Sequence, residues 1–97
     1  MYGLTLRQRF PDLVPADVCA AYHGGDEWRA ATLLGRARLL YAPGTAQWAV
    51  LERLEGLLWI AVQREVEGTF ALDRADRVLD ALMTQAETEY PGLDWLD

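Results

Sequence analysis

Hydrophobic residues recur along most of the chain at intervals of three and four, which is the period of an amphipathic α-helix. Two stretches, residues 27–41 and 75–86, show this most clearly. Their apolar stripes are Ala30, Leu33, Leu34, Ala37, Leu40 and Tyr41 in the first, and Ala75, Val78, Leu79, Leu82, Met83 and Ala86 in the second. Asp26 precedes the first stripe, where its carboxylate can cap the free N–H groups of a helix. Both stretches are therefore predicted to be helices.

Start and stop signals predict two shorter helices near the beginning of the chain. Thr5 followed by Gln8 is a possible capping box, which opens one helical turn that cannot pass Pro11. Pro15 suits the first position of the next helix, because a proline there has no N–H group to leave unpaired. Gly24 is expected to end this helix in a left-handed conformation, which costs glycine little.

The centre of the chain allows two interpretations. After the break at residues 42–45, in which Thr45 can cap a helix, residues 46–67 carry a broad apolar stripe. The stripe consists of Val50, Leu51, Leu54, Leu57, Leu58, Ala61 and Val62, with Glu52, Arg53, Gln63, Arg64 and Glu67 opposite. We favour one long helix, followed after Gly68 by a last helix that Asp73 caps, because alternation at period two is poor. The alternative is a β-meander over residues 46–72.

The expected fold class is therefore all-α, a compact bundle of four to five helices, with an α+β fold containing that meander as the alternative. The 97 residues fit a single domain over residues 1–97. Hydrophobic residues make up 52% of the chain and charged residues 25%, which is typical of globular proteins. No internal repeat or linker divides the sequence.

Charge is distributed unevenly along the chain, whose net charge is −6. Residues 1–64 contain six acidic residues and seven arginines, whereas residues 65–97 contain nine acidic residues and two arginines. Nucleic-acid phosphates repel carboxylates, and binding them needs basic side chains that release counterions. We therefore expect no direct binding of DNA or RNA.

The cysteine content and the apolar runs bear on the compartment. Cys19 is the only cysteine, so no internal disulfide can form and a reducing cytoplasm is the simplest location. The first ten residues contain two arginines and no apolar run, so we expect no signal peptide. The longest apolar run, residues 57–62, is far shorter than the roughly 20 residues that span a bilayer, so we expect no membrane partner.

No set of residues in the sequence predicts catalysis, a cofactor or a metal. Cys19 and His23 stand four positions apart on a predicted helix, but two ligands do not hold a zinc ion, which takes four. A nucleophilic pair would need direct contact and a third residue to orient the ring. Gly24-Gly25 lacks the preceding strand and the lysine of a phosphate-binding loop. We expect a non-enzymatic protein without a small-molecule substrate.

Four apolar residues are candidates for binding a partner. Trp48, Trp59 and Val66 form a second apolar strip on the predicted long helix, offset from its main stripe. A helix has room for one core face, so this strip must meet another helix or a partner, and tryptophans are enriched among interface anchors. Trp95, in the acidic tail, either folds back onto the core or serves as a short linear motif.

An acidic row on the last predicted helix is a second candidate surface, made of Asp73, Asp76, Asp80 and Glu87. Such a row can imitate a line of phosphates and occupy the basic groove of a nucleic-acid-binding protein. This would make the chain an inhibitor of the kind that phages and mobile elements encode. The alternative interpretation is an acidic face that keeps the helix soluble.

The first third of the chain resembles two known groups of proteins. The residues concerned are Phe10-Pro11-Asp12-Leu13, Val18, Gly25-Asp26 and Ala31 with Leu33-Leu34. They look like the three-helix CUE and UBA domains, and that resemblance implies a ubiquitin-binding module. The spacing from Phe10 to the leucine pair is a few residues shorter here than in those domains. The stretch is equally similar to the small helical head-to-tail adaptor proteins of tailed phages, so we assign neither family.

The sequence leads to a ranked set of functions. First comes a non-enzymatic interaction or assembly protein, a small helical adaptor that binds another protein or its own copy. The alternatives are the acidic nucleic-acid mimic and the UBA/CUE-like binding module. The interaction protein comes first for two reasons. No catalytic set is apparent in the sequence, and the aromatic strip is more apolar surface than a single core face needs.

Overall fold

The computed structural model describes residues 5–82 and 90–97 of the chain. These residues form α-helices and one short 3₁₀ turn, and none of them lies in a strand. The elements are α1 (Leu6–Arg9), α2 (Ala16–His23), α3 (Glu27–Arg38), α4 (Ala46–Ala61), α5 (Glu65–Leu82) and the 3₁₀ turn η2 (Leu93–Leu96). The predicted all-α bundle is confirmed. The alternative β-meander over residues 46–72 does not form, because this stretch folds as α4 and the beginning of α5.

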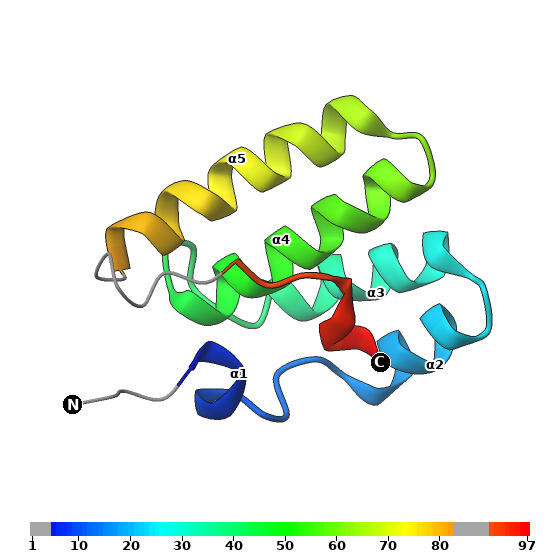
Figure 1. Ribbon diagram of the computed structural model, residues 1–97, viewed down its shortest axis with the longest axis horizontal. Helices are drawn as coiled ribbons and strands as arrows, with labels where there is room; N and C mark the ends of the chain where they lie inside the picture. Colours follow the sequence, from blue (N-terminus) through cyan, green and yellow to red (C-terminus); the bar gives the residue numbers. More distant parts are fainter. Residues whose placement is uncertain (1–4, 83–89) are drawn as a thin grey trace.

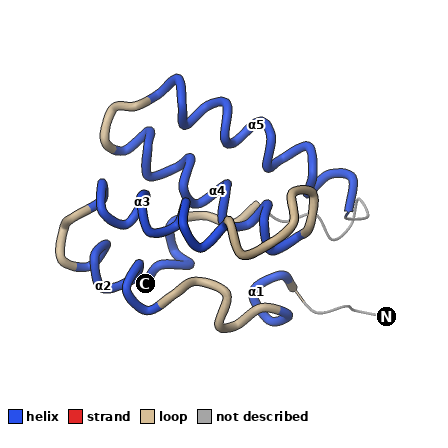
Figure 2. The backbone as a smooth tube through the Cα atoms, turned by 180° about the vertical axis from the view of Figure 1, so that it is seen from behind, coloured by secondary structure: helices blue, strands red, loops and turns tan. Residues whose placement is uncertain are grey.

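The helix α4 lies at the centre of the arrangement. It packs against both α3 and α5, and α3 packs in turn against α2. Figures 1 and 2 show the molecule from opposite sides, with α5 along the outer edge and α4, α3 and α2 following in order. The turn η2 contacts α2 and α4, so the end of the chain closes over the core. Within the described residues, no helix combines the length and hydropathy that a membrane crossing requires.

Three of the predicted helix caps are confirmed. The hydroxyl of Thr5 accepts a hydrogen bond from the backbone N–H of Gln8, whose side chain accepts one from the Thr5 N–H in return. Asp26 caps α3 through the N–H of Arg29, and Thr45 caps α4 in the same way. Each side-chain oxygen satisfies an N–H group that a first helical turn leaves unpaired.

The end of α2 differs from the prediction by one residue. Gly24 has a φ of −78°, and the left-handed residue is Gly25, at +83°. The N–H of Gly25 bonds to the carbonyl of Tyr22 and that of Asp26 to the carbonyl of Ala21. This pair of bonds is the Schellman arrangement, which requires the left-handed residue one position beyond the C-cap.

The predicted long helix over residues 46–67 is wrong, because α4 ends at Ala61. Gln63 takes a left-handed conformation, with a φ of 68°. Its N–H bonds to the carbonyl of Ile60, and the N–H of Arg64 bonds to that of Trp59, in a second Schellman arrangement. Glycine usually occupies this position, and its absence left the sequence without a visible stop signal.

The last helix starts earlier than predicted. It begins at Glu65, so Gly68 and Asp73 lie inside α5 and Asp73 is not a cap. Gly68 weakens a helix by about 1 kcal/mol through its intrinsic propensity, which favours the predicted break. The helix continues through Gly68 because this residue is where α5 touches α4 most closely.

The contact between α4 and α5 brings their backbones together at two glycines. A Cβ atom on Gly68 would lie 2.6 Å from the carbonyl oxygen of Gly56 and 2.5 Å from Cγ1 of Ile60. A Cβ atom on Gly56 would lie 2.9 Å from the carbonyl oxygen of Gly68. Real Cβ atoms do not approach backbone oxygen this closely, so only glycine fits at either position.

The core corrects two further predictions about which residues face inward. Leu34, Leu51, Leu54, Leu58, Leu79 and Leu96 are among its fully buried side chains. Leu40 was predicted on the core face of its helix, yet it is 80% exposed, because α3 ends at Arg38 and the chain turns away. Glu52 was predicted on the polar side of α4, yet only 1% of it is exposed.

The close approach of the glycines leads to a first prediction. Gly68→Ala should destabilise the protein by about 1–3 kcal/mol, because the new methyl group meets backbone and Ile60 rather than space. Gly35→Ala is the matched control, since it also replaces a glycine within a helix but meets a side-chain carboxylate, that of Glu55 at 3.0 Å, and no backbone. Urea unfolding of the three chains measures the difference. A Gly68→Ala chain as stable as the Gly35→Ala chain would contradict the packing described.

Candidate protein-interaction surfaces

Both tryptophans of α4 are half-buried and pack against the hydrophobic core. The ring of Trp59 meets that of Trp28 on α3 edge to face, with 5.1 Å between centroids and 84° between planes. Its Nε1 donates a hydrogen bond to Oε2 of Glu55, at 3.1 Å. The strip was predicted to meet another helix or a partner; for Trp59 that helix is α3, whereas Trp48 packs against the core. Their role in binding a partner stays a prediction.

Arg64 lies against this aromatic pair, in which Trp28 remains 49% exposed. Its guanidinium lies 5.3 Å from the ring centroid of Trp28 and 5.8 Å from that of Trp59, within cation–π range. The same group donates to Glu67, and this hydrogen bond holds the pKa of the Glu67 carboxyl below its ordinary value. Arg64 thus fastens the α4–α5 turn to α3.

A buried carboxylate joins three helices. Oε1 of Glu52, on α4, accepts a hydrogen bond of 2.6 Å from Nε of Arg74 on α5, while its Oε2 lies 3.7 Å from Nη1 of Arg38 on α3. Arg38 also donates to Glu55, at 3.0 Å. Oε2 of Glu52 is buried without a hydrogen bond from any described residue. The guanidinium of Arg38, 3.7 Å away, is the positive charge that faces this oxygen.

Val66 lies on α5 rather than on the helix that carries the tryptophans. It is 66% exposed, and Phe70, one turn later, is 61% exposed. Together with Thr69 and Glu65 they line an open hollow of 380 Å³. We call Val66, Thr69 and Phe70 the α5 outer face. Phe70 was absent from the predicted site because its place on the face opposite α4 depends on where α5 begins.

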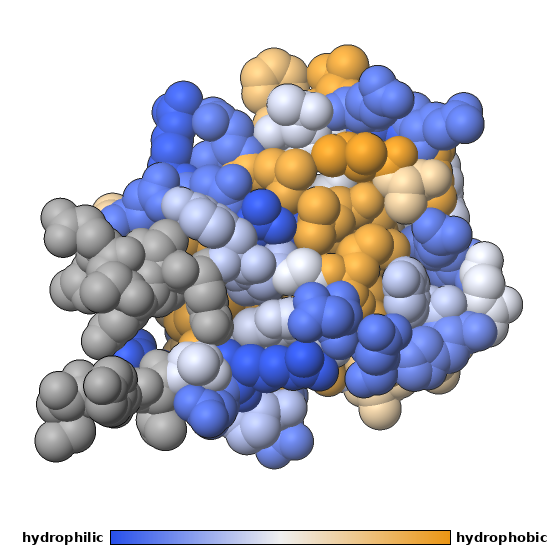
Figure 3. Space-filling view, in the orientation of Figure 1, coloured by the Kyte–Doolittle hydropathy of each residue, from blue (hydrophilic) through white to orange (hydrophobic). Residues whose placement is uncertain are grey.

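The opposite side of α5 is lined by small residues. Its buried positions are Gly68, Ala71, Ala75 and Leu79. In the first half of the helix the small residues Gly68 and Ala71 therefore point inward, whereas Val66 and Phe70 point outward and Leu72 is part-buried. Figure 3 shows one side of this region, where hydrophobic residues gather over the second half of α4 and the first half of α5. Hydrophilic residues surround this area in the same view.

Two carboxylates of the predicted acidic row are paired with arginines of the same chain. Asp76 accepts a hydrogen bond of 2.8 Å from Nε of Arg53, which also donates to the carbonyl of Pro91. Asp73 lies 2.9 Å from Nη2 of Arg77, four residues further along α5. Each of these pairs reduces the negative potential that the row presents to solvent.

The third member of the row, Asp80, accepts a hydrogen bond from the hydroxyl of Tyr90. This bond raises the pKa of the Tyr90 phenol, since it favours the protonated form. Glu87 lies outside the described residues. Among Asp73, Asp76 and Asp80, each carboxylate thus has a partner within the chain, which weakens their resemblance to a row of phosphates.

The tail that contains Trp95 folds back onto the bundle. Trp95 is half-buried against the core, and the next residue, Leu96, is fully buried. The guanidinium of Arg7, on α1, lies 5.8 Å from the Trp95 ring centroid and pairs with Asp94 at 3.4 Å. In this arrangement Trp95 joins the two ends of the described chain, and its role in binding a partner stays a prediction.

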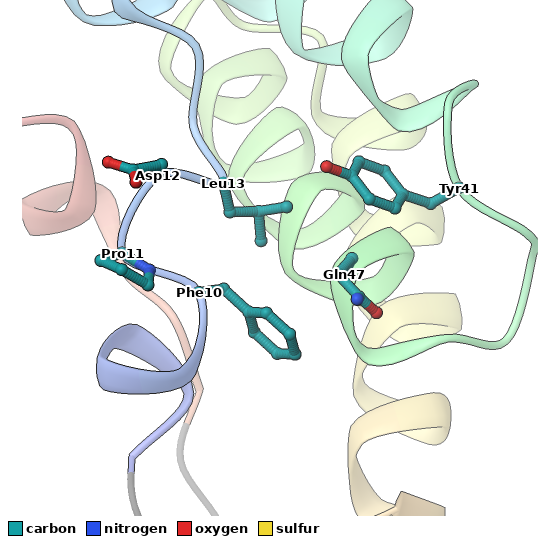
Figure 4. A pocket seen from close by; sticks show the side chains of 6 residues that line it. All are labelled: Phe10, Pro11, Asp12, Leu13, Tyr41 and Gln47. Atoms are coloured by element: carbon teal, nitrogen blue, oxygen red, sulfur yellow. The ribbon is translucent and has the colours of Figure 1, made fainter.

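A second hollow, of 230 Å³, lies between the loop after α1 and the loop after α3. Figure 4 shows Phe10 and Leu13 on one side pointing toward Tyr41 and Gln47 on the other. Asp12, on the first loop, points away from the opening in this view. Nothing in the hydrophobic pattern indicated this hollow, because most of its walls come from two loops, with Gln47 of α4 added.

Two leucines stand beside this hollow, immediately before Tyr41. Leu39 is 78% exposed and Leu40 is 80% exposed, the highest values among the large apolar residues described. Single exposed leucines are common on protein surfaces, whereas adjacent ones next to an apolar hollow form a patch.

The two residues considered for catalysis or metal binding lie on α2. Cys19 is half-buried, and His23 is exposed with its Nε2 3.9 Å from Oδ1 of Asp97. No group of three potential metal ligands occurs within residues 5–82 and 90–97.

Comparison with protein-family models, with curated proteins and with solved structures finds no match for this chain. Function is therefore argued from the surfaces described above. Of the residues behind the resemblance to CUE and UBA domains, Ala31 and Leu34 are fully buried in α3 and cannot contact a partner.

The buried carboxylate leads to a second prediction. Glu52→Gln keeps the shape of the side chain but removes the charge that faces Arg38 and Arg74. We expect it to destabilise the protein by about 1–3 kcal/mol in urea unfolding, because Arg74 loses its charged acceptor and Arg38 keeps only that of Glu55. Glu67→Gln, on an exposed carboxylate with one arginine partner, is the control and should leave the unfolding midpoint nearly unchanged. Equal midpoints for the two variants would refute the structural role assigned to Glu52.

Proposed function

We propose that this chain is a non-enzymatic protein-interaction module whose working surface is the α5 outer face (Val66, Thr69 and Phe70). The single observation behind the proposal is that a valine and a phenylalanine one helical turn apart are both more than 60% exposed. Burying such side chains against a partner contributes about 1.5–3 kcal/mol each. Binding another protein is the simplest use of this surface.

The inward face of α5 supports the proposal. Core packing explains Gly68, Ala71 and Ala75, because a close contact with α4 requires small residues. It does not explain Val66 and Phe70, which lie on the other side and add nothing to that contact. A partner with an apolar groove would bury them as neighbouring anchors, in the way that grooves bind the apolar side of a helix.

The surroundings of the α5 outer face fit a specific contact. Glu65 stands at one end, and the pair Asp73–Arg77 follows Phe70 by one turn. Interfaces commonly combine an apolar centre with a polar rim that sets orientation. We therefore infer a partner with an apolar groove flanked by charged residues.

The acidic mimic ranks second. It depends on free carboxylates along α5, and the pairing of Asp73, Asp76 and Asp80 within the chain leaves them less available. The α5 outer face requires no such rearrangement, which places the interaction module first.

Cross-linking from the α5 outer face tests the proposal. A photoreactive phenylalanine analogue at position 70 should cross-link a defined protein in cells of the organism that encodes the chain. The same analogue at Ala20, an exposed position on α2, is the control. With the partner purified, Val66→Asp together with Phe70→Asp should weaken binding about 30-fold or more, as expected for anchor residues. Both positions are exposed, so circular dichroism should report an unchanged fold.

Two results would reject the proposal. One is the same set of cross-linked proteins from positions 70 and 20. The other is an unchanged affinity of the Val66→Asp/Phe70→Asp chain for the captured protein. Ala20→Asp provides the baseline for the effect of a new surface carboxylate.

A further inference from the structure

We propose that the loop after α3 is a self-association surface, where Leu39 and Leu40 of one copy enter the hollow beside Phe10 of a second copy. The occupant is thus a second copy of this chain, and the surface is separate from the α5 outer face. Four observations support it. Leu39 and Leu40 project from an ordered turn, which we call the leucine projection, and a hollow with apolar walls lies beside it. Opposite charges stand next to the projection and the hollow, and both lie on one side of the molecule.

The projection is held rigidly by the backbone. The N–H groups of Leu39, Leu40 and Tyr41 bond in succession to the carbonyls of residues 36, 37 and 38, at 3.1–3.2 Å. Thr45 closes the same loop through two bonds to the carbonyl of Ala42. The leucines are therefore exposed on an ordered turn, and binding them costs little conformational entropy.

The hollow has the size and lining that an aliphatic side chain needs. Its volume is 230 Å³, and a cavity of about 150 Å³ is enough for a benzene ring. Phe10, Leu13 and Tyr41 provide apolar walls beside the polar residues Asp12 and Gln47, and Tyr41 lies across the opening from Leu13 (Figure 4). A leucine placed there would exclude water from both rings.

The charges beside the two features are opposite. Asp12 lies on the loop that lines the hollow, with its side chain directed away from the opening, and Arg36 lies in the last turn of α3, three residues before Leu39. Both are exposed, and neither side chain pairs with another described residue. When the leucines of one copy enter the hollow of the other, these charges can pair across the rim, which favours this orientation.

The position of the two features makes the contact symmetric. Leu40 is followed by Tyr41, which lines the hollow, so projection and hollow are adjacent on each copy. A twofold axis between two copies then lets each projection enter the other's hollow at once. Such an isologous contact closes on itself and gives a dimer rather than a chain of copies.

Sedimentation velocity of the full chain from about 1 μM to 1 mM tests the proposal, because small interfaces dissociate in this range. The wild-type chain should change from monomer to dimer. Leu40→Glu should raise the dissociation constant about 100-fold or more, since the dimer contains two such contacts. Val66→Glu is the matched control, because it places the same carboxylate at an exposed apolar position away from the hollow. It should leave dimerisation unchanged.

A charge exchange adds a second arm. Asp12→Arg and Arg36→Asp should each weaken the dimer, and the chain with both changes should recover most of the lost affinity. A wild-type chain that stays monomeric up to about 1 mM, or a Leu40→Glu chain that dimerises like the wild type, would overturn the proposal. Loss of the dimer in Val66→Glu but not in Leu40→Glu would also overturn it, and would assign self-association to the α5 outer face instead.

Discussion

The backbone contact between Gly56 and Gly68 determines how the rest of the molecule is arranged. Because neither residue has a side chain, α4 and α5 approach until carbonyl oxygens fill the space where Cβ atoms would lie. At this distance the guanidinium of Arg74 can reach Glu52 beneath it, and Arg53 can reach Asp76. A wider spacing would separate both ion pairs and leave the carboxylate of Glu52 buried without Arg74.

The same contact explains why the surface is apolar where it is. A close helix pair needs small residues between its members, so two large side chains in the first half of α5, those of Val66 and Phe70, are found on the other face. In an ordinary amphipathic helix the inward stripe carries the bulk of the hydrophobic volume. Here Phe70 and Val66 lie outside that stripe, and among residues 5–82 and 90–97 no other element covers them.

The sequence predicts those features that depend on neighbouring residues in the chain, and it does not predict those that depend on contacts between helices. Helices with polar caps were found, because Thr5, Asp26 and Thr45 act on their own neighbours. The sequence did not predict the α4–α5 turn, because Gln63 adopts a left-handed conformation that is uncommon for glutamine. Gly68 was misread as a break, since its role depends on a residue of another helix. The candidate surfaces show the same division: the pattern named Val66 but placed it on the wrong helix, and Phe70, Leu39 and Leu40 depend on where helices begin and end.

The carboxylate of Glu52 has a consequence for how this protein can change in evolution. Its partners come from α3 and α5, and a neutral residue at position 52 would leave Arg74 without its charged acceptor and Arg38 with Glu55 alone. Substitution is therefore tolerated only when the three positions change together, for example to apolar residues of similar volume. Homologues too divergent to align elsewhere should still keep this triad as a unit or lack all of it. The three positions thus provide a signature by which distant relatives can be recognised.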